Sequence, residues 1–185
     1  MNPDKVCEDL QEKLNYRFVK PALLKQALTH SSYANEQKSP DYERLEFVGD
    51  AVLELTVSDH LYHTMEDMRE GDMTKLRASL VCEPTLSFCA REIELDRYIL
   101  LGKGEEQTGG RNRDSIISDV FEAVIGALYL DGGISAAKSF VEQYVLKDMY
   151  NKIEFVDSKS KLQEYTQERG IDLRYELLSE SCPAH

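Results

Sequence analysis

The chain has 185 residues, of which 42% are hydrophobic and 30% charged, and a formal net charge of −12 at pH 7. This length can bury one good core plus a small appendage, and the composition excludes a disordered or collagen-like chain. No apolar run approaches the roughly 20 residues that span a bilayer, and the N-terminus lacks a signal-peptide pattern, so a soluble cytoplasmic protein without membrane contacts is expected. Four scattered cysteines without CxxC spacing disfavour a zinc site and a disulfide framework. The negative net charge argues against nucleic-acid binding by electrostatic attraction alone. It is compatible with an enzyme that contacts phosphates through bound cations.

Apolar residues recur at helical spacing along most of the chain, which predicts an all-α main body. Prolines at 3 and 21 stand where the first two helices are expected to begin, because a proline in the first turn loses no backbone hydrogen bond. Further helices are expected over about 42–63, 72–81, 83–93, 114–131 and 135–150. The polar segments 31–42 and 101–113 are predicted as connectors, the second because it carries glycines and no apolar periodicity.

The character of the sequence changes after residue 150. We expect a main domain over 1–150, a linker over 151–156, and the beginning of a second unit over 157–185. This last segment reads as a polar helix followed by a strand-like stretch around 175–178. It is too short to fold alone.

Two pairs of acidic residues lie on predicted helices. Glu46 and Asp50, in ERLEFVGDAVL, are four positions apart, and Asp119 and Glu122, in SDVFEAVIGALYLDGG, are three apart, so each pair projects from one helix face. Like charges about 4 Å apart repel by roughly 4 kcal/mol at an effective dielectric constant near 20, so helices that bring the pairs together need cations between them. The leading interpretation is therefore a divalent-metal site.

A solvated helix face is the simpler alternative for the first acidic pair, because charged residues usually lie there. Glycines favour the metal site: Gly49 stands beside the first pair, and Gly126 follows the second pair by one turn. Glycine inside a helix costs about 1 kcal/mol relative to alanine and is often kept for close packing. Two helices in near backbone contact are therefore predicted.

Other acidic residues and one histidine have weaker claims. Glu43, Glu70 and Asp72 could belong to an outer shell of such a site, although acids in the first turn of a helix are equally explained by the helix dipole. His30 could act as a base, but bonding a neighbouring backbone group at a helix end is the more common use.

Several other chemistries are disfavoured by missing motifs. No histidine has an acid three positions before it, so the Glu-x-x-His signature of di-iron bundles is absent from the sequence, as are a GxSxG elbow and a P-loop. Basic residues near the acidic helices are expected to be mostly solvated surface, but they could also meet phosphates: Lys75, Arg77, Lys103, Arg111 and Arg113.

Several separated motifs, in order, resemble bacterial ribonuclease III, an endonuclease that cuts double-stranded RNA. ERLEFVGDAVL is similar to that family's signature, with Val48 where leucine is more usual. The resemblance continues through LTHSSYANE, EGDMTKLRASLV, LGKGEEQTGGRNR and SDVFEAVIGALYLDGG, and covers about residues 5–150. Residues 157–185 resemble the beginning of the family's double-stranded-RNA-binding domain, with Cys182 where glycine is usual. The implied fold is an all-α nuclease domain followed by the first helix and strand of an incomplete α+β domain.

The resemblance also implies roles for particular residues. Glu43 and Glu70 match acidic positions at the rim of the family's site, and Phe47 matches an aromatic residue that inserts into the partner subunit of a homodimer. Asp50 and Glu122 are expected to be closest to the chemistry. The residues implied to bind Mg²⁺, for which Mn²⁺ can substitute, are Glu46, Asp50, Asp119 and Glu122.

The implied activity is magnesium-dependent hydrolysis of phosphodiester bonds in double-stranded RNA, giving 5′-phosphate products with short 3′ overhangs. It would serve the maturation of ribosomal, transfer and messenger RNA. A non-catalytic double-stranded-RNA-binding protein on the same fold is the alternative, but the presence of all four carboxylates argues against it. A helical protein-interaction domain would leave the glycines unexplained.

Overall fold

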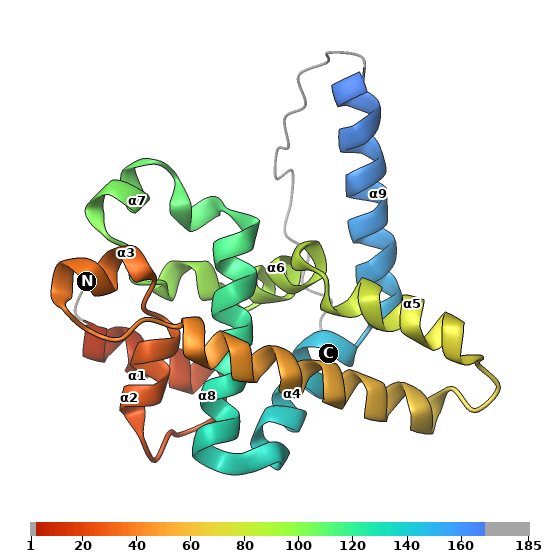
Figure 1. Cartoon of the computed structure of the whole chain (residues 1–185), viewed down its shortest axis with the longest axis horizontal. Coiled ribbons are helices and arrows are strands. Elements are labelled where there is room, and N and C mark those ends of the chain that lie inside the picture. Colours follow the sequence, from red (N-terminus) through yellow and green to blue (C-terminus); the bar gives the residue numbers. More distant parts are fainter. Residues whose placement is uncertain (1–2, 169–185) are drawn as a thin grey trace.

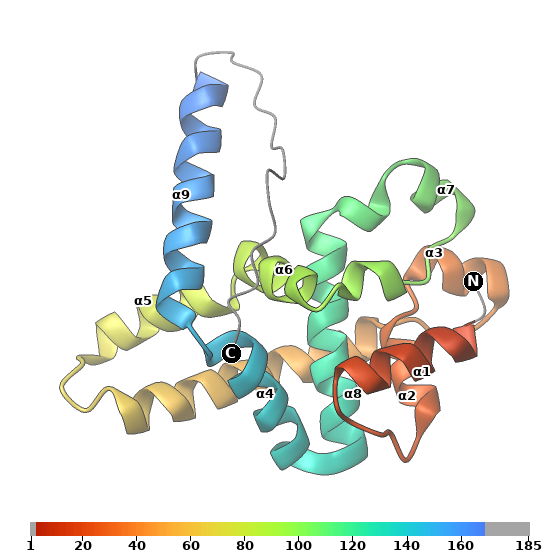
Figure 2. The same cartoon turned by 180° about the vertical axis from the view of Figure 1, so that it is seen from behind.

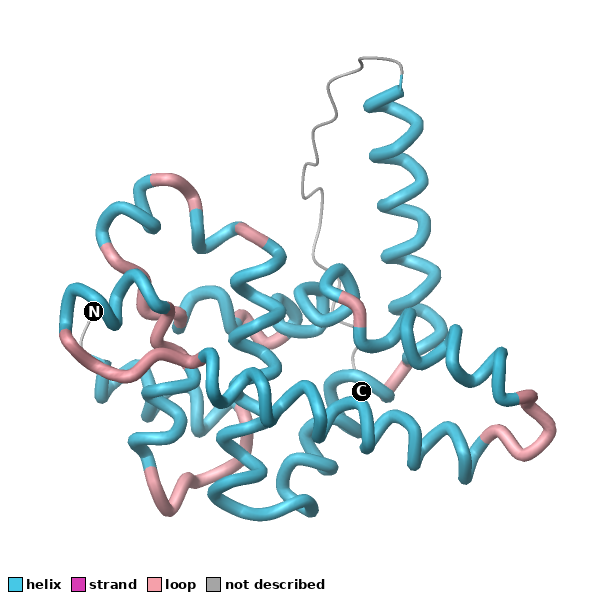
Figure 3. Tube along the Cα trace, in the orientation of Figure 1, coloured by secondary structure: helices cyan, strands magenta, loops and turns pink. Residues whose placement is uncertain are grey.

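The computed structural model describes residues 3–168, which are helical nearly throughout and contain no strand (Figures 1 and 3). The predicted all-α class of the main body is confirmed. The strand predicted around 175–178 lies outside the described residues. The elements are α1 (Pro3–Lys13), α2 (Pro21–Ala27), α3 (Ser31–Gln37), α4 (Glu43–Thr64), α5 (Glu70–Val81), α6 (Glu83–Glu92), the 3₁₀ turns η1 (Leu95–Tyr98) and η2 (Gly110–Asn112), α7 (Lys103–Gln107), α8 (Asp114–Val141), the π-helical turn η3 (Glu142–Leu146) and α9 (Met149–Glu168).

Helix α8 is the central element, and α4 crosses it (Figures 1 and 2). Helices α2 and α6 also pack against α8, so its apolar residues are covered by several elements. The stretch Asp114–Leu146 is long and apolar enough to cross a membrane by length and composition, contrary to the expectation that no apolar stretch reaches that length. Half of its most apolar window is buried inside the protein (50%), and a helix at the centre of a helical domain is apolar for this reason. The largest wholly buried side chains of α8 are Ile117, Phe121 and Ile125.

Two segments predicted as connectors contain short helices. Helix α3 lies in the first connector: the ring of His30 accepts a hydrogen bond from the backbone amide of Ser32 at its start, and Lys38 ends it in the left-handed conformation (φ 54°). Helix α7 and turn η2 lie in the glycine-rich connector, where Arg111 pairs with Glu106. Helix capping and ion pairs thus stabilise the short helices in these segments. Apolar periodicity is missing there, so the sequence did not predict them.

The end of the main body also differs from the predicted boundaries. Gly133 has φ 75° and breaks the helix axis, as the glycine pair predicts, but helical structure resumes at once and continues into η3. The predicted last helix over 135–150 is interrupted between η3 and α9. The linker expected over 151–156 lies inside α9, which projects from the body in both views (Figures 1 and 2). Phe155 of α9 contacts Phe88 of α6 with ring centroids 5.0 Å apart, which holds this end of α9 against the body. The division into domains stays a prediction.

Candidate active site

Two glycines set the distance between α4 and α8 at their crossing. A methyl group on Gly49 would overlap the backbone carbonyl of Glu122, and one on Gly126 would overlap the backbone carbonyl of Leu45. Each helix therefore presents a glycine to the main chain of the other. The predicted near contact of two helix backbones is confirmed, and it brings together acidic residues that are far apart in the sequence.

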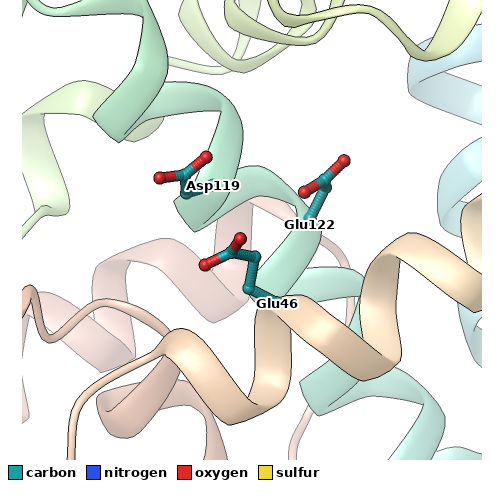
Figure 4. A group of neighbouring side chains, drawn as sticks. All are labelled: Glu46, Asp119 and Glu122. Carbon is teal, nitrogen blue, oxygen red and sulfur yellow. The ribbon is translucent and has the colours of Figure 1, made fainter.

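Three carboxylates meet beside this crossing. Glu46 comes from α4, and Asp119 and Glu122 come from α8; one oxygen of each lies within 4.8 Å of the others (Figure 4). All three side chains are partly buried. Asp50, one turn after Glu46, is exposed and lies outside this group, but its negative charge contributes to the raised pKa of Glu122 and of Glu46. The structure thus gathers three of the four predicted ligands and leaves the fourth at the edge.

The pKa values of these carboxyl groups reflect burial and mutual repulsion. Burial, followed by the charges of Asp50, Glu46 and Asp119, raises the pKa of Glu122 to about 8. Burial and then Asp119 raise the pKa of Glu46 to about 7. Burial also raises the pKa of Asp119, partly offset by a hydrogen bond from Tyr42. Ionising all three at neutral pH is unfavourable unless a cation or donor compensates the charge.

Tyr42 is a residue of this site that the sequence did not indicate. Its hydroxyl donates a hydrogen bond to Oδ2 of Asp119 at 3.2 Å, and its side chain is only 5% exposed. Burial and the neighbouring Asp119 raise the pKa of Tyr42, so the hydroxyl stays a donor. A buried tyrosine needs a partner for its hydroxyl, but nothing in the sequence says that this partner lies on α8.

The two candidate outer acids lie in different places. Glu43 is exposed in the first turn of α4 and adds to the raised pKa of Glu46, so it is at the rim of the carboxylate group. Glu70 begins α5 and accepts a hydrogen bond from Thr74, at a surface pocket between α4 and α5 that Arg77 also lines. Its charge is not among the causes of the raised pKa of Glu46 or Glu122.

Two of the basic residues that could meet phosphates have acidic partners within the protein. Arg77 pairs with Glu54 (2.9 Å) on α4, and Arg113 pairs with Glu105 (2.6 Å) in the glycine-rich segment. Lys75 is far more exposed, its nearest carboxylate oxygen lying 3.9 Å away. Arg77 thus holds α5 against α4, and Arg113 holds the start of α8 against α7.

An apolar face of α4 is open to solvent. Phe47 is 79% exposed, Leu55 61% and Tyr62 71%, and their spacing places all three on one side of the helix. Large apolar side chains grouped on one exposed face are typical of an interaction surface. We call these three residues the apolar α4 face.

Comparisons with known proteins agree with this arrangement. A family model described as ribonuclease-III-like matches residues 20–149. Ribonuclease 3 of Listeria monocytogenes is 50% identical over 184 residues, covering 96% of this chain and 80% of that protein. Ribonuclease 3 of Bacillus licheniformis is 51% identical over 182 residues, covering 95% of this chain and 73% of that protein.

Solved structures of known proteins also match this chain. A nuclease domain of ribonuclease III from Campylobacter jejuni, described for structural flexibility in a region involved in dimer formation, superposes with a TM-score of 0.72 and 42% identity, covering 77% of this chain and 97% of that one. A second structure of that nuclease domain gives a TM-score of 0.71 at the same identity. The matched family model spans most of the chain, including α4 and α8 with their carboxylates, and so the chain belongs to the ribonuclease III family.

Proposed function

We propose that the protein is a magnesium-dependent endoribonuclease that hydrolyses phosphodiester bonds in double-stranded RNA. The observation that carries this proposal is the convergence of Glu46, Asp119 and Glu122 at the crossing of α4 and α8. The family relationship supports ribonuclease activity. We propose duplex RNA as the substrate class because the sequence motifs resemble those of bacterial ribonuclease III, which cuts double-stranded RNA. Recognition of such a duplex rests mainly on its A-form shape and 2′-hydroxyls.

The residues present fit a hard divalent cation. Carboxylate oxygens are the ligands that Mg²⁺ prefers, and Mn²⁺ accepts the same donors. Burial and the neighbouring carboxylates raise the pKa values of Glu46 and Glu122, so a bound cation would favour their ionised forms. Glu46, Asp119 and Glu122 would hold the ion, with Asp50 beside them. When bound, Mg²⁺ stabilises negative charge developing on a phosphodiester and activates the attacking water.

The carboxyl groups of the site must be deprotonated and held in position before hydrolysis. Glu46 and Glu122 must give up the protons that their raised pKa values favour near neutral pH. Asp119 is held from behind by the hydroxyl of Tyr42. The glycine contacts at Gly49 and Gly126 hold the two helix backbones close together, so the main-chain positions that carry Glu46 and the α8 carboxylates are fixed relative to one another. Such preorganisation removes the cost of gathering the acids during catalysis.

The protein acts as a homodimer in this proposal, with Phe47 of the apolar α4 face buried against the partner subunit. The exposure of that face supports it, as does the dimer-forming region of the Campylobacter jejuni nuclease domain. The products are 5′-phosphate ends with short 3′ overhangs, released during maturation of ribosomal, transfer and messenger RNA. A cytoplasmic location belongs to the proposal, in keeping with the reduced thiols of Cys82 and Cys89.

The decisive experiment is cleavage of a long RNA duplex with and without Mg²⁺, using single-stranded RNA of the same sequence as the control. We expect cleavage of the duplex with Mg²⁺ and none with chelator. Binding of duplex without cleavage at any Mg²⁺ or Mn²⁺ concentration would instead support the non-catalytic RNA-binding alternative. Equal cleavage of both RNAs would refute the choice of substrate.

A further inference from the structure

Tyr42 touches both helices that supply the carboxylates. Its hydroxyl donates to Oδ2 of Asp119 on α8 at 3.2 Å. Its backbone carbonyl accepts the amide of Glu46, at 3.0 Å, in the first turn of α4. One buried residue therefore links the positions of two acids that lie on different helices.

The tyrosine is itself held from the opposite side. Its backbone amide donates to the carbonyl of Thr29 at 3.0 Å. Its ring lies against that of His30, with centroids 5.7 Å apart. Gln26 donates to the carbonyl of the preceding residue, Asp41, at 2.9 Å. The α2–α3 segment thus fixes the phenol so that it cannot turn away from α8 without disturbing buried structure.

A fixed donor on one oxygen of a carboxylate restricts the rotation of the whole group. When Oδ2 of Asp119 accepts the tyrosine hydroxyl, the orientation of the group is set, and an oxygen of Asp119 lies with those of Glu46 and Glu122 within 4.8 Å. Outer hydrogen bonds of this kind orient metal ligands, and their removal typically lowers metal affinity.

We propose that Tyr42 is a positioning residue for Asp119, presenting that carboxylate to the divalent cation that the site binds. The inference rests on the proposed function, since it concerns the same carboxylates. It adds a role for a residue that precedes the signature helix and carries no charge. Tyr42 acts through Asp119 and touches neither RNA nor the reacting phosphate.

The test is Tyr42→Phe, which keeps the buried ring and removes only the hydroxyl. We expect the Mn²⁺ and Mg²⁺ concentrations needed for half-maximal thermal stabilisation to rise by about 10-fold to 100-fold, the usual effect of losing such an outer hydrogen bond. The metal requirement for cleavage should rise in parallel, while the rate at saturating metal stays close to that of the unaltered protein.

Tyr16→Phe is the matched control. Tyr16 also donates its hydroxyl to an aspartate, Oδ2 of Asp131 at 2.9 Å, where that carboxylate accepts the amides of Val19 and Lys20. This variant loses the same kind of hydrogen bond in a different part of the fold. Its melting temperature without metal should fall, but its metal requirement should not change.

A second variant tests whether the effect passes through Asp119. In an Asp119→Asn background, adding Tyr42→Phe should raise the metal requirement little further, because the effects of residues that act through one another are not additive.

Three results would each overturn the inference: an unchanged metal requirement in Tyr42→Phe, an equal rise in Tyr16→Phe, or full additivity of Tyr42→Phe with Asp119→Asn. If the unaltered protein neither binds Mn²⁺ nor cleaves duplex RNA, the proposed function itself fails. If the unaltered protein binds metal and cleaves RNA but Tyr42→Phe has the same metal requirement, only the role of Tyr42 is refuted and the proposed function stands.

Discussion

Glu122 has the highest pKa among the carboxyl groups gathered at the crossing, about 8, because it is buried and faces Asp50, Glu46 and Asp119. An isolated glutamate has a pKa near 4.3, so the folded protein binds protons here that the unfolded chain releases. Stability without metal is therefore highest below about pH 4.5 for this group and is lost as the pH rises through about 8. Glu46, with a pKa of about 7, acts in the same direction.

Because protonation of Glu122 and Glu46 stabilises the folded protein, the effect of Mg²⁺ on its stability should depend on pH. At about pH 6 protons compete with Mg²⁺ for Glu46 and Glu122, whereas at about pH 8.5 they compete much less, so Mg²⁺ should raise the melting temperature more at the higher pH. Differential scanning fluorimetry at both pH values, with Mg²⁺ and with chelator, measures this difference. A melting temperature that Mg²⁺ does not change at either pH would contradict the metal site.

The variant Glu122→Gln should separate cleavage from RNA binding. The amide keeps the size of the side chain but removes a negative charge from the proposed metal-binding group. Cleavage at limiting Mg²⁺ should fall by orders of magnitude, since each roughly 1.4 kcal/mol of lost transition-state stabilisation is about tenfold in rate. High Mg²⁺ or Mn²⁺ should restore part of the rate by mass action.

The control for this variant is Glu83→Gln, at an exposed position in the first turn of α6. It makes the same chemical change away from the carboxylates and should leave cleavage unaltered. Gel-shift measurements of duplex RNA binding should give similar affinities for both variants. If Glu122→Gln cuts RNA at the unaltered rate at limiting Mg²⁺, Glu122 does not bind the ion.

At the level of elements, the crossing of α4 and α8 depends on backbone contact. Gly49→Ala places a methyl group against the carbonyl of Glu122, and the helices must separate to accept it. We expect a loss of stability of about 1–3 kcal/mol or more, as for other overpacked cores, together with a loss of cleavage because the carboxylates move apart. Thermal melts and cleavage assays measure the two effects.

Gly71→Ala is the matched control on α5, where an added methyl group meets nothing within 4 Å. Alanine favours helix over glycine by up to about 1 kcal/mol, so this variant should melt at the same temperature or slightly higher. An equally stable Gly49→Ala protein would show that the helices do not approach as closely as described.

The two elements that carry the site were predictable, and the short ones were not. Helix α4 was expected over about 42–63 and spans Glu43–Thr64, because a long run of buried positions imposes its period on the sequence. Helix α3 has one buried residue, Ala34, and is defined by its caps, so no apolar period marks it. A linker was predicted over 151–156, yet Lys152 is buried there and donates to the carbonyl of Tyr144, a contact that the sequence cannot reveal.

The same contrast holds within the site. Glu46, Asp119 and Glu122 were identified because their spacing on each helix is local information. The partner of Tyr42 lies 77 residues away, so its role depends on how the helices cross. The exposed position of Asp50 was also not predictable, since helical spacing gives its face but not which neighbours cover that face.

At the level of the whole molecule, dimer formation should depend on the apolar α4 face. Phe47→Ala removes its most exposed aromatic side chain and should weaken self-association by about 2 kcal/mol or more, as for a central interface residue. Sedimentation velocity over a range of protein concentrations measures this change.

Val19→Ala is the comparison variant, because Val19 is similarly exposed (81%) but lies between α1 and α2. It should associate like the unaltered protein. An unaltered protein that sediments as a monomer at all concentrations would refute the homodimer, and equal weakening by both variants would assign the interface to a wider surface.

The sequence separation between the two halves of the site also matters while the protein is being synthesised. Tyr42 and Asp119 are 77 residues apart, and ribosomes add about 5–20 residues per second, so the first half of the site emerges about 4–15 seconds before the second. Until α8 has left the exit tunnel, Glu46 has no carboxylate partners from that helix and no closely packed backbone behind it. A nascent chain whose α8 is still inside the ribosome therefore has no assembled carboxylate site beside the messenger and ribosomal RNA that are producing it.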